Sequence, residues 1–264
     1  MSIVRINVKP DTLDDENRKF EQRPLRQPLF LNSVPKCGSH LLSNILRMFV
    51  PVESQYQVEF IQHHFIQRHM AAFDTNRNMM SWGHLFFAER FKPLLENVRH
   101  IVLVRDPYDW ALAMARFVLS NEFSAPGMED IKDPQVPIST VLNFAIEGRR
   151  PQLAPLAVTF HFNAVLWINE GVRVVRYEDL IGAVRDLDSD KAEEYFSDLF
   201  EACGIERPAD WRERVRIGSD RKQSGTAREN LTGVAANIPA ELPPEQKRLV
   251  DLAYPGLRAK LGYQ

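Results

Sequence analysis

One stretch of this chain, residues 29–50 (LFLNSVPKCGSHLLSNILRMFV), constrains its fold more than any other. The apolar run Leu29–Leu31 predicts a buried strand, and Gly38 predicts a turn. The apolar residues beyond the turn recur at the i, i+3, i+4 spacing of an amphipathic helix, with Ser39 as its cap. A helix N-terminus carries unpaired N–H groups and about half a positive charge, and Lys36 adds a full charge. The stretch therefore predicts a strand, an anion-binding loop and a helix, with a phosphate as the expected class of ligand.

The order of residues inside this loop separates it from two common phosphate sites. A nucleoside triphosphatase loop reads GxxxxGKS/T, so that Lys follows Gly and a hydroxyl for magnesium follows Lys. Here Lys36 precedes Gly38, and Cys37 stands where the hydroxyl would be. A phosphatase loop places Arg six positions beyond a nucleophilic Cys, and that position is Ser43. The loop thus has no evident magnesium ligand, and Cys37 is interpreted as a small loop residue rather than a nucleophile.

The composition of the chain limits the class of protein to which it can belong and the partners to expect. With 264 residues, 44% hydrophobic and 26% charged, the chain matches an ordinary globular protein with one α/β domain. The net charge of -2 gives no reason to expect nucleic acid or an anionic membrane as a partner. The two cysteines fit a reducing compartment, and no apolar run approaches the roughly 18 residues of a membrane span. We expect a cytoplasmic protein without an integral membrane segment, and the oligomeric state stays open. The polar residues 1–28 predict an exposed N-terminal arm ahead of a domain at 29–264.

A second strand-to-helix segment begins at His100. The uninterrupted run Ile101–Val104 predicts a strand buried on both faces of a parallel sheet. Arg105 stands at its end, and a helix is expected to begin near Asp109. An Arg at the carboxyl end of a central strand points into the crevice where open α/β sheets bind ligands. The alternative interpretation is a surface Arg paired with Asp106 or Asp109, and the spacing alone favours neither.

The remaining histidines have both structural and chemical interpretations. His84 lies in the short apolar run MMSWGHLFF, where a lone His is more often structural than catalytic. His63, His64 and His69 lack the spacing of a zinc site, and we interpret their segment (51–78) as a helix with partly exposed histidines. The same segment is rich in aromatic residues and is a weaker candidate for the lining of an acceptor pocket.

The second half of the chain continues the alternation of helices and strands. Its expected elements are a helix at 156–169 that stops before Gly171, a strand at 172–175, a helix at 191–203, a polar loop at 219–233 and an amphipathic helix in the tail, 243–263.

These motifs, in this order, resemble those of the PAPS-dependent sulfotransferases of the cytosolic and bacterial type. Residues 35–41 (PKCGSHL) are similar to the family's PKSGTTW-like loop, which grips the 5′-phosphosulfate of 3′-phosphoadenylyl sulfate (PAPS). His84 matches the general base that ends a strand in the family. Arg105-Asp106-Pro107 and Asp109 match the motif that holds the 3′-phosphate, although its Ser falls on Ala113. The turn at Tyr177 matches the family's strand end near the nucleotide.

The resemblance implies roles for individual residues. His84 and Lys36 would be catalytic, with His84 as general base and Lys36 stabilising the leaving phosphate. In the late loop the family's Arg falls on Arg228, with Arg221 and Lys222 as competing candidates and a solvated basic loop as the alternative. The implied PAPS-binding residues are Lys36, Cys37, Gly38, Ser39, His40, Leu41, Arg105, Tyr177 and Arg228.

The resemblance also implies a fold and an activity. The expected fold is α/β, a P-loop-like three-layer arrangement with a central, mainly parallel sheet flanked by helices. The expected activity transfers a sulfuryl group from PAPS, as co-substrate and without a metal, to a hydroxyl or amine of a small-molecule, glycan or lipid acceptor. The alternatives are an ATP-dependent small-molecule kinase and a degenerate, non-catalytic nucleotide-binding protein.

Overall fold

The computed structural model describes residues 5–6, 10–57, 60–121, 123–149, 152–224 and 233–264. The chain divides into two compact units. The first, which we call the sheet unit, comprises Lys9–Val104 and Phe162–Gly225. The second, the helical unit, comprises Met1–Val8, Arg105–His161 and Thr226–Gln264. The expected division at residue 28 stays a prediction.

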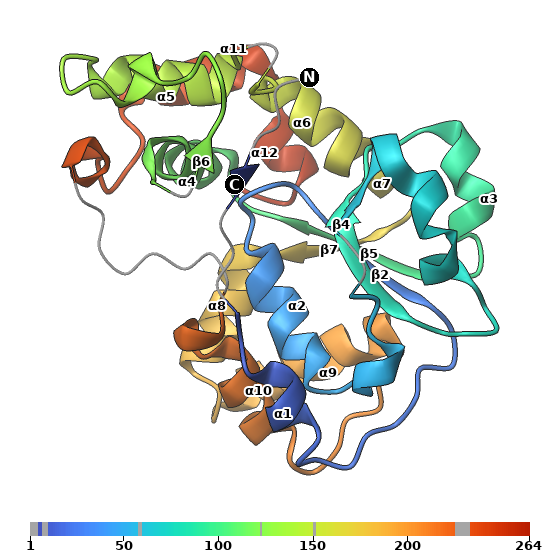
Figure 1. Ribbon diagram of the computed structural model, residues 1–264. Helices are drawn as coiled ribbons and strands as arrows, with labels where there is room; N and C mark the ends of the chain where they lie inside the picture. The colour runs from blue at the N-terminus through green and yellow to red at the C-terminus, as the bar shows by residue number, and fades with distance from the viewer. Residues whose placement is uncertain (1–4, 7–9, 58–59, 122, 150–151, 225–232) are drawn as a thin grey trace. The chain divides into compact units, whose positions relative to one another are not determined.

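The described residues of the sheet unit form a five-stranded sheet in the order β3-β4-β2-β5-β7. All of its strand pairs are parallel, which confirms the expected central sheet (Figure 1). The central strand β5 is strongly apolar at its end because both faces are covered there, and its last four residues are completely buried. The strands are β2 (Leu29–Ser33), β3 (Ile61–Gln62), β4 (Met80–His84), β5 (Arg99–Val104) and β7 (Arg173–Arg176).

The register of β2 and β4 fixes where their last side chains lie. Leu31 is opposite Trp82 and Asn32 is opposite Gly83, so Ser33 and His84 end neighbouring strands at the same edge of the sheet. Gly83 allows β3 to approach closely, because a Cβ atom there would lie 2.1 Å from the carbonyl oxygen of Ile61.

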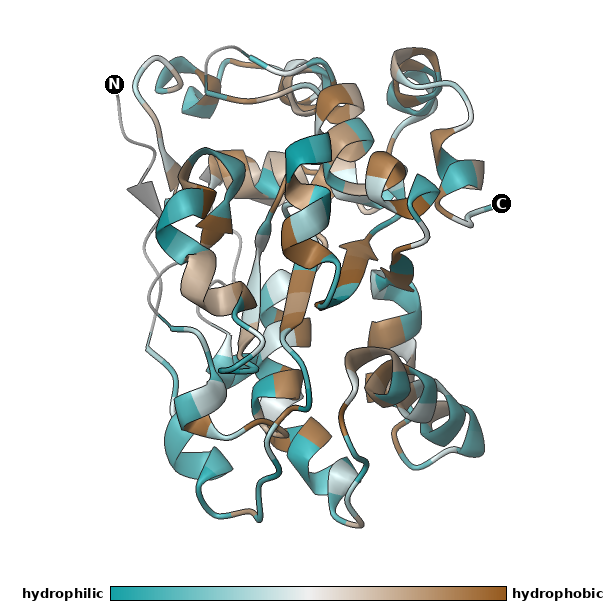
Figure 2. Ribbon diagram, turned by 90° about the vertical axis from the view of Figure 1, so that its right-hand side faces the viewer, coloured by the Kyte–Doolittle hydropathy of each residue, from teal (hydrophilic) through white to brown (hydrophobic). Residues whose placement is uncertain are grey.

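Helices cover both faces of the sheet. Phe30 of β2 belongs to an apolar cluster with side chains of η2, α3 and α7, while α2 and α9 contact the strands from the other face. Figure 2 shows hydrophobic residues in the strands and, in the helices, hydrophobic residues alternating with hydrophilic ones. The α-helices are α1 (Leu13–Asn17), α2 (Ser39–Arg47), α3 (Lys92–Leu95), α7 (Leu166–Asn169), α8 (Tyr177–Arg185), α9 (Asp190–Cys203) and α10 (Trp211–Ser219). The 3-10 helices are η1 (Val52–Ser54), η2 (His63–Phe73), η3 (Glu89–Phe91) and η6 (Arg221–Gln223).

One local prediction in the sheet unit is wrong. Ser39 is not the cap of α2 but its first residue, because its hydroxyl bonds the Ser33 hydroxyl at 2.7 Å and Gly38 takes the cap position. The helix predicted around the three histidines is present, as the 3-10 helix η2. Its interruption is at His69, whose dihedral angles are non-helical and whose buried ring bonds the Tyr56 hydroxyl at 3.0 Å.

The N-terminal segment is not simply an exposed arm. Leu13 of α1 is completely buried, and the Asn17 amide donates to the carbonyl oxygens of Arg47 (2.6 Å) and Val50 (3.0 Å). Arg47 in turn forms an ion pair with Asp14 at 2.7 Å. The described part of the arm therefore packs on α2, a contact between distant segments that the polar composition does not reveal.

The helical unit contains a short antiparallel strand pair and a group of packed helices. The side chain of Asp106 caps α4 by accepting from the Tyr108 N–H at 2.9 Å, so this helix begins at Pro107, before the expected Asp109. The buried Trp110 packs edge-on against Phe160. The elements are β1 (Arg5–Ile6), β6 (Phe123–Ser124), α4 (Pro107–Leu119), η4 (Asp130–Lys132), α5 (Ile138–Glu147), α6 (Leu156–Phe160), η7 (Gly233–Asn237), α11 (Pro244–Ala253) and α12 (Leu257–Lys260).

The helix expected at 156–169 is present but changes character in its middle. A π-helical segment, η5 (His161–Val165), joins α6 to α7. Across the described residues, no helix combines the length and the apolar character that crossing a membrane requires.

Candidate active site

The loop between β2 and α2 has an unusual backbone. Lys36 (φ 66) and Gly38 (φ 95) both adopt the left-handed conformation, which costs a residue other than Gly about 1–2 kcal/mol. Gly38 also permits a close approach, because a Cβ atom there would lie 2.5 Å from Cδ2 of Tyr177. The structure therefore brings two sequence-predicted elements together, the loop and the Tyr177 ring at the start of α8.

The loop feeds directly into the N-terminus of the nine-residue helix α2. Such an end favours anions through its unpaired N–H groups and its positive partial charge. Cys37 is completely buried, which agrees with its interpretation as a small loop residue. The hydrogen bond between the Ser39 and Ser33 hydroxyls ties the first turn of α2 to the end of β2. These contacts fix both ends of the loop, at β2 and at the first turn of α2.

His84 is held at the end of β4 by Ser33. Its Nδ1 lies 2.6 Å from the Ser33 carbonyl oxygen and 3.1 Å from the Ser33 hydroxyl. A carbonyl oxygen only accepts, so Nδ1 carries the proton and Nε2 carries the lone pair. Burial lowers the pKa of His84 to about 3, and the nearby charge of Lys36 also lowers it. The ring is therefore neutral at physiological pH and has the form that a general base requires.

Lys36, His40 and His84 form one electrostatic group. Burial lowers the pKa of His40 to about 4, and the charge of Lys36 contributes to that shift as it does for His84. The cation of the loop thus lies close enough to both rings to disfavour their protonation.

Several aromatic side chains lie in the segments near His84, and one of them contacts its ring. The Phe60 ring lies edge-on to His84 with a centroid distance of 4.5 Å, and the same ring contacts Trp82 at 4.8 Å. Phe86, two residues beyond His84, stacks on His63 at 4.8 Å with an interplanar angle of 3°. Phe162 follows in this stack and is 38% exposed. We call Phe60, Trp82, Phe86 and Phe162 the aromatic cluster. Single aromatic residues were visible in the sequence, but their grouping depends on the pairing of β3 with β4.

Arg105 follows the last residue of β5 and is the first residue of the second segment of the helical unit. Its neighbour Asp106 forms an ion pair with Arg258 at 2.8 Å. Burial lowers the pKa of Arg116 on α4, and the positive charge of Arg105 lowers it further. Arg116 stands one helical turn beyond Ala113, on the same side of α4. Arg116 was not among the site residues predicted from the sequence, because only the hydroxyl that Ala113 lacks was expected on this helix.

The three candidate residues of the late loop differ in what the structure shows of them. Arg228 lies outside the described residues. Arg221 and Lys222 are exposed residues of η6, and the Lys222 N–H donates to the Asp220 carboxylate at 2.9 Å. The Asn44 amide of α2 donates to the Gln223 carbonyl oxygen of η6 at 2.8 Å, so η6 is held against the helix that follows the β2–α2 loop.

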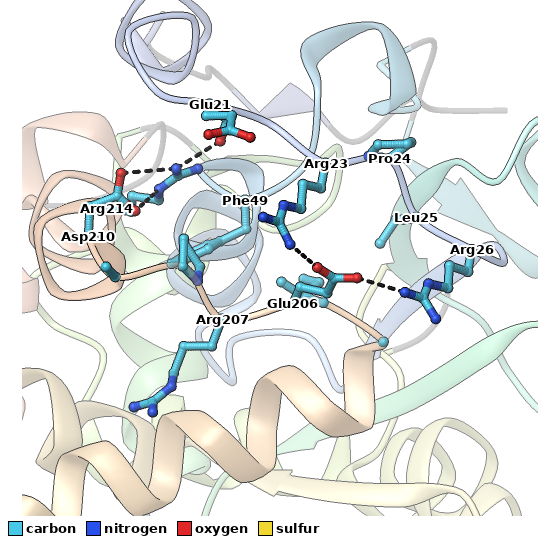
Figure 3. A pocket seen from close by; sticks show the side chains of 14 residues that line it. Glu21, Arg23, Pro24, Leu25, Arg26, Phe49, Glu206, Arg207, Asp210 and Arg214 are labelled. Carbon is cyan, nitrogen blue, oxygen red and sulfur yellow. Dashed lines mark hydrogen bonds and ion pairs between the residues drawn. The ribbon is translucent and has the colours of Figure 1, made fainter.

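A separate cavity of about 430 Å³ lies in the sheet unit (Figure 3). No residue of the β2–α2 loop or of β4 lines it. Figure 3 shows its charged side chains bonded to one another: Arg23 and Arg26 pair with Glu206, and Arg214 pairs with Asp210. Because these charges offset one another within the wall, the cavity is a weaker candidate for an anion than the loop.

One comparison with solved structures supports this fold. Neither protein-family models nor curated proteins give a match to the sequence. Among solved structures, mouse sulfotransferase SULT7A1 complexed with PAP is similar, with 14% identity over 93% of this chain and 89% of that chain and a TM-score of 0.57. The sulfotransferase domain from the curacin biosynthetic pathway aligns with 13% identity over 92% of this chain and 99% of that chain, with a TM-score of 0.42. The chain has the sulfotransferase α/β fold.

Proposed function

We propose that this protein transfers the sulfuryl group of PAPS to a hydroxyl or amine of a small-molecule, glycan or lipid acceptor. The observation that carries the proposal is the state of His84: a neutral imidazole whose Nδ1–H is directed to the Ser33 carbonyl oxygen, beside the loop that contains Lys36. A neutral base next to an anion-binding loop is the arrangement that such a transfer needs. The fold of the solved neighbour supports the same activity.

The reaction follows from these positions. The acceptor oxygen attacks sulfur while Nε2 of His84 takes the acceptor's proton. The bond between sulfur and the bridging phosphate oxygen breaks, and the electron pair stays on that oxygen as adenosine 3′,5′-bisphosphate (PAP) departs. Lys36 and the N–H groups of the loop stabilise this developing negative charge. Sulfuryl transfer shares the in-line geometry of phosphoryl transfer, so positioning and electrostatics supply most of the rate enhancement.

The nucleotide contacts are the second part of the proposal. Lys36 to Leu41 hold the 5′-phosphosulfate, and the Tyr177 ring that contacts Gly38 lies against the nucleotide. Arg105 binds the 3′-phosphate. Arg116 supplies the second donor there in place of the hydroxyl that Ala113 lacks, a role supported by the lowering of the Arg116 pKa by the nearby charge of Arg105. Arg228 of the late loop completes the PAPS contacts.

The acceptor is expected to bind beside the aromatic cluster. Phe60 contacts the His84 ring directly, and Phe162 leaves part of its surface open to solvent. An acceptor that carries an apolar or planar group next to its hydroxyl therefore gains contacts near the base.

Replacement of His84 tests the proposal. A positioned base contributes about 10² to 10⁴ in rate, so His84→Ala should lower kcat at least a hundredfold while the dissociation constant for PAP changes little. His161→Gln is the matched control, since this histidine bonds Tyr254 in the helical unit. Sulfate transfer to an acceptor panel and calorimetric titration with PAP supply the two measurements. Near-normal turnover of His84→Ala removes His84 from the mechanism.

The same titrations separate the alternative functions. A kinase would bind ATP with magnesium more tightly than PAP, and this outcome would contradict the sulfotransferase proposal. A non-catalytic nucleotide-binding protein would bind PAP and transfer sulfate to no acceptor of the panel.

A further inference from the structure

A buried pair of asparagine amides lies directly behind the Ser33–His84 contact. Asn32 of β2 and Asn163 of η5 are both completely buried. The Asn163 Nδ2 group donates to Oδ1 of Asn32 and to the Ser33 carbonyl oxygen, each at 3.0 Å. The same carbonyl oxygen accepts from His84 Nδ1 at 2.6 Å. Asn163 and His84 are thus two donors on one acceptor atom.

The second amide, that of Asn32, hydrogen-bonds the backbone on either side of the Ser33–His84 contact. Oδ1 of Asn32 accepts from the N–H of Leu85, the residue after His84, at 2.9 Å, and from the Ser33 N–H at 3.0 Å. Its Nδ2 donates to the Leu85 carbonyl oxygen at 3.2 Å. Asn32 therefore holds the end of β4 in register with the end of β2, while Asn163 holds the carbonyl between them.

Two features argue that this arrangement serves more than packing. Burying an amide costs free energy unless the amide is hydrogen-bonded. An apolar pair of similar volume would fill the same space without that cost. Asn163 also stands at the centre of η5, and π-helical segments are rare and occur frequently at functional sites. Both features converge on the one carbonyl oxygen that determines which ring nitrogen of His84 carries the proton.

We propose that Asn163 is a positioning residue for His84: its amide fixes the Ser33 carbonyl oxygen so that the imidazole keeps its proton on Nδ1 and presents Nε2 to the acceptor. The inference rests on the proposed function, since it gives the base its correct tautomer. A carbonyl oxygen that accepts two hydrogen bonds has both lone pairs engaged and little freedom to turn away. Without the amide, the oxygen keeps a single donor, and the ring gains access to the other tautomer and to other orientations.

Variants of Asn163 test whether its hydrogen-bond donation, rather than the volume of its side chain, is what His84 requires. Asn163→Leu approximates the volume of the side chain and cannot donate to the Ser33 carbonyl oxygen. At metal sites, loss of a group that orients a histidine ligand costs about 10- to 100-fold in activity. Asn163→Leu should lower kcat by a similar factor while the acceptor KM and the PAP dissociation constant stay within about twofold. Asn163→Ser, which is shorter and neutral, serves if Asn163→Leu does not fold.

Asn17 supplies a matched control. It is 1% exposed and its Nδ2 also donates to two backbone carbonyl oxygens, those of Arg47 and Val50. Asn17→Leu removes the same kind of bonds from the same unit without touching Ser33 or His84. It should lower the unfolding free energy as Asn163→Leu does, with no comparable change in kcat.

The decisive measurement is the tautomer of His84 by 15N NMR of the full-length protein at neutral pH, with the signal assigned through His84→Gln. The wild type should show a protonated Nδ1, and Asn163→Leu should show a mixture or the Nε2–H form. An unchanged tautomer, or a loss of kcat equal to that of Asn17→Leu, overturns the inference. If the tautomer changes while His84→Ala keeps normal turnover, the proposed function fails and the positioning contact stands.

Discussion

His100 allows a direct test of how burial changes the pKa of a titratable group in this fold and, through it, the stability of the protein. It lies on β5, with its ring 5.4 Å from Phe30 and 4.8 Å from Trp167, centroid to centroid. Within the described part of the chain, its Nε2 has no hydrogen-bond partner. Burial alone lowers the pKa of His100 to about 3. The folded protein therefore holds this ring neutral where the unfolded chain protonates it.

The sign of the effect follows from proton binding. Below the unfolded pKa of about 6.5 the unfolded state binds a proton that the folded state does not, so the free energy of unfolding falls as pH falls. Each pH unit between about 6.5 and 3 costs about 1.4 kcal/mol, which gives about 2 kcal/mol at pH 5. His100→Phe keeps an aromatic ring between Phe30 and Trp167 and removes the titration. We expect near wild-type stability at pH 7.5 and a gain of about 2 kcal/mol over the wild type at pH 5.

Urea unfolding at pH 7.5, 6.5, 5.5 and 5.0, at constant ionic strength, measures this difference. His100→Gln is the control, because it removes the titration but packs less well. Its stability should be lower than that of His100→Phe at every pH, with the same reduced slope against pH. If His100→Phe and the wild type lose stability in parallel between pH 7.5 and 5, the ring is not held neutral and the reasoning is refuted.

Two further predictions concern the nucleotide site. Gly38→Ala should lower the unfolding free energy by more than Gly171→Ala and should weaken PAP binding. Both glycines have positive φ, but of the two only Gly38 lies against another side chain, because a Cβ atom there would be 2.5 Å from the Tyr177 ring. Urea unfolding and calorimetry measure the two effects, and equal losses in the two variants would contradict the role of that contact. Arg116→Leu should weaken PAP binding about tenfold or more and leave the affinity for adenosine 5′-monophosphate unchanged, because only PAP carries a 3′-phosphate; an equal loss for both nucleotides would show that Arg116 acts elsewhere.

The local elements of the fold were predictable because their signals are local. The apolar run before Gly38 and the β-branched run before Arg105 mark β2 and β5, and both strands end near the predicted residues. The strand that ends at His84 was expected from the family resemblance rather than from a local signal, and β4 ends at that residue. In β2 and β5 a few neighbouring side chains decide whether the chain is extended, turned or helical.

The contacts that give the site its chemistry were not predictable, because they join distant segments. Ser33 reaches His84 only through the parallel register of β2 and β4. Asn163 is a single polar residue in an apolar helical pattern, and its partner Asn32 is more than a hundred residues away. Nothing in the spacing indicates a π-helical segment, so the buried amide had no signal of its own. The missed packing of α1 has the same origin, since it depends on Arg47.

The position of His84 at the last residue of β4 also limits how this chain tolerates insertions and deletions. Side chains alternate between the two faces of a strand, so one residue added or lost within Met80–Gly83 would turn the imidazole to the opposite face and break its bond to Ser33. Insertions and deletions are therefore expected to be tolerated in the segments before and after this strand, whereas a change of length within the strand would remove the contact between His84 and Ser33.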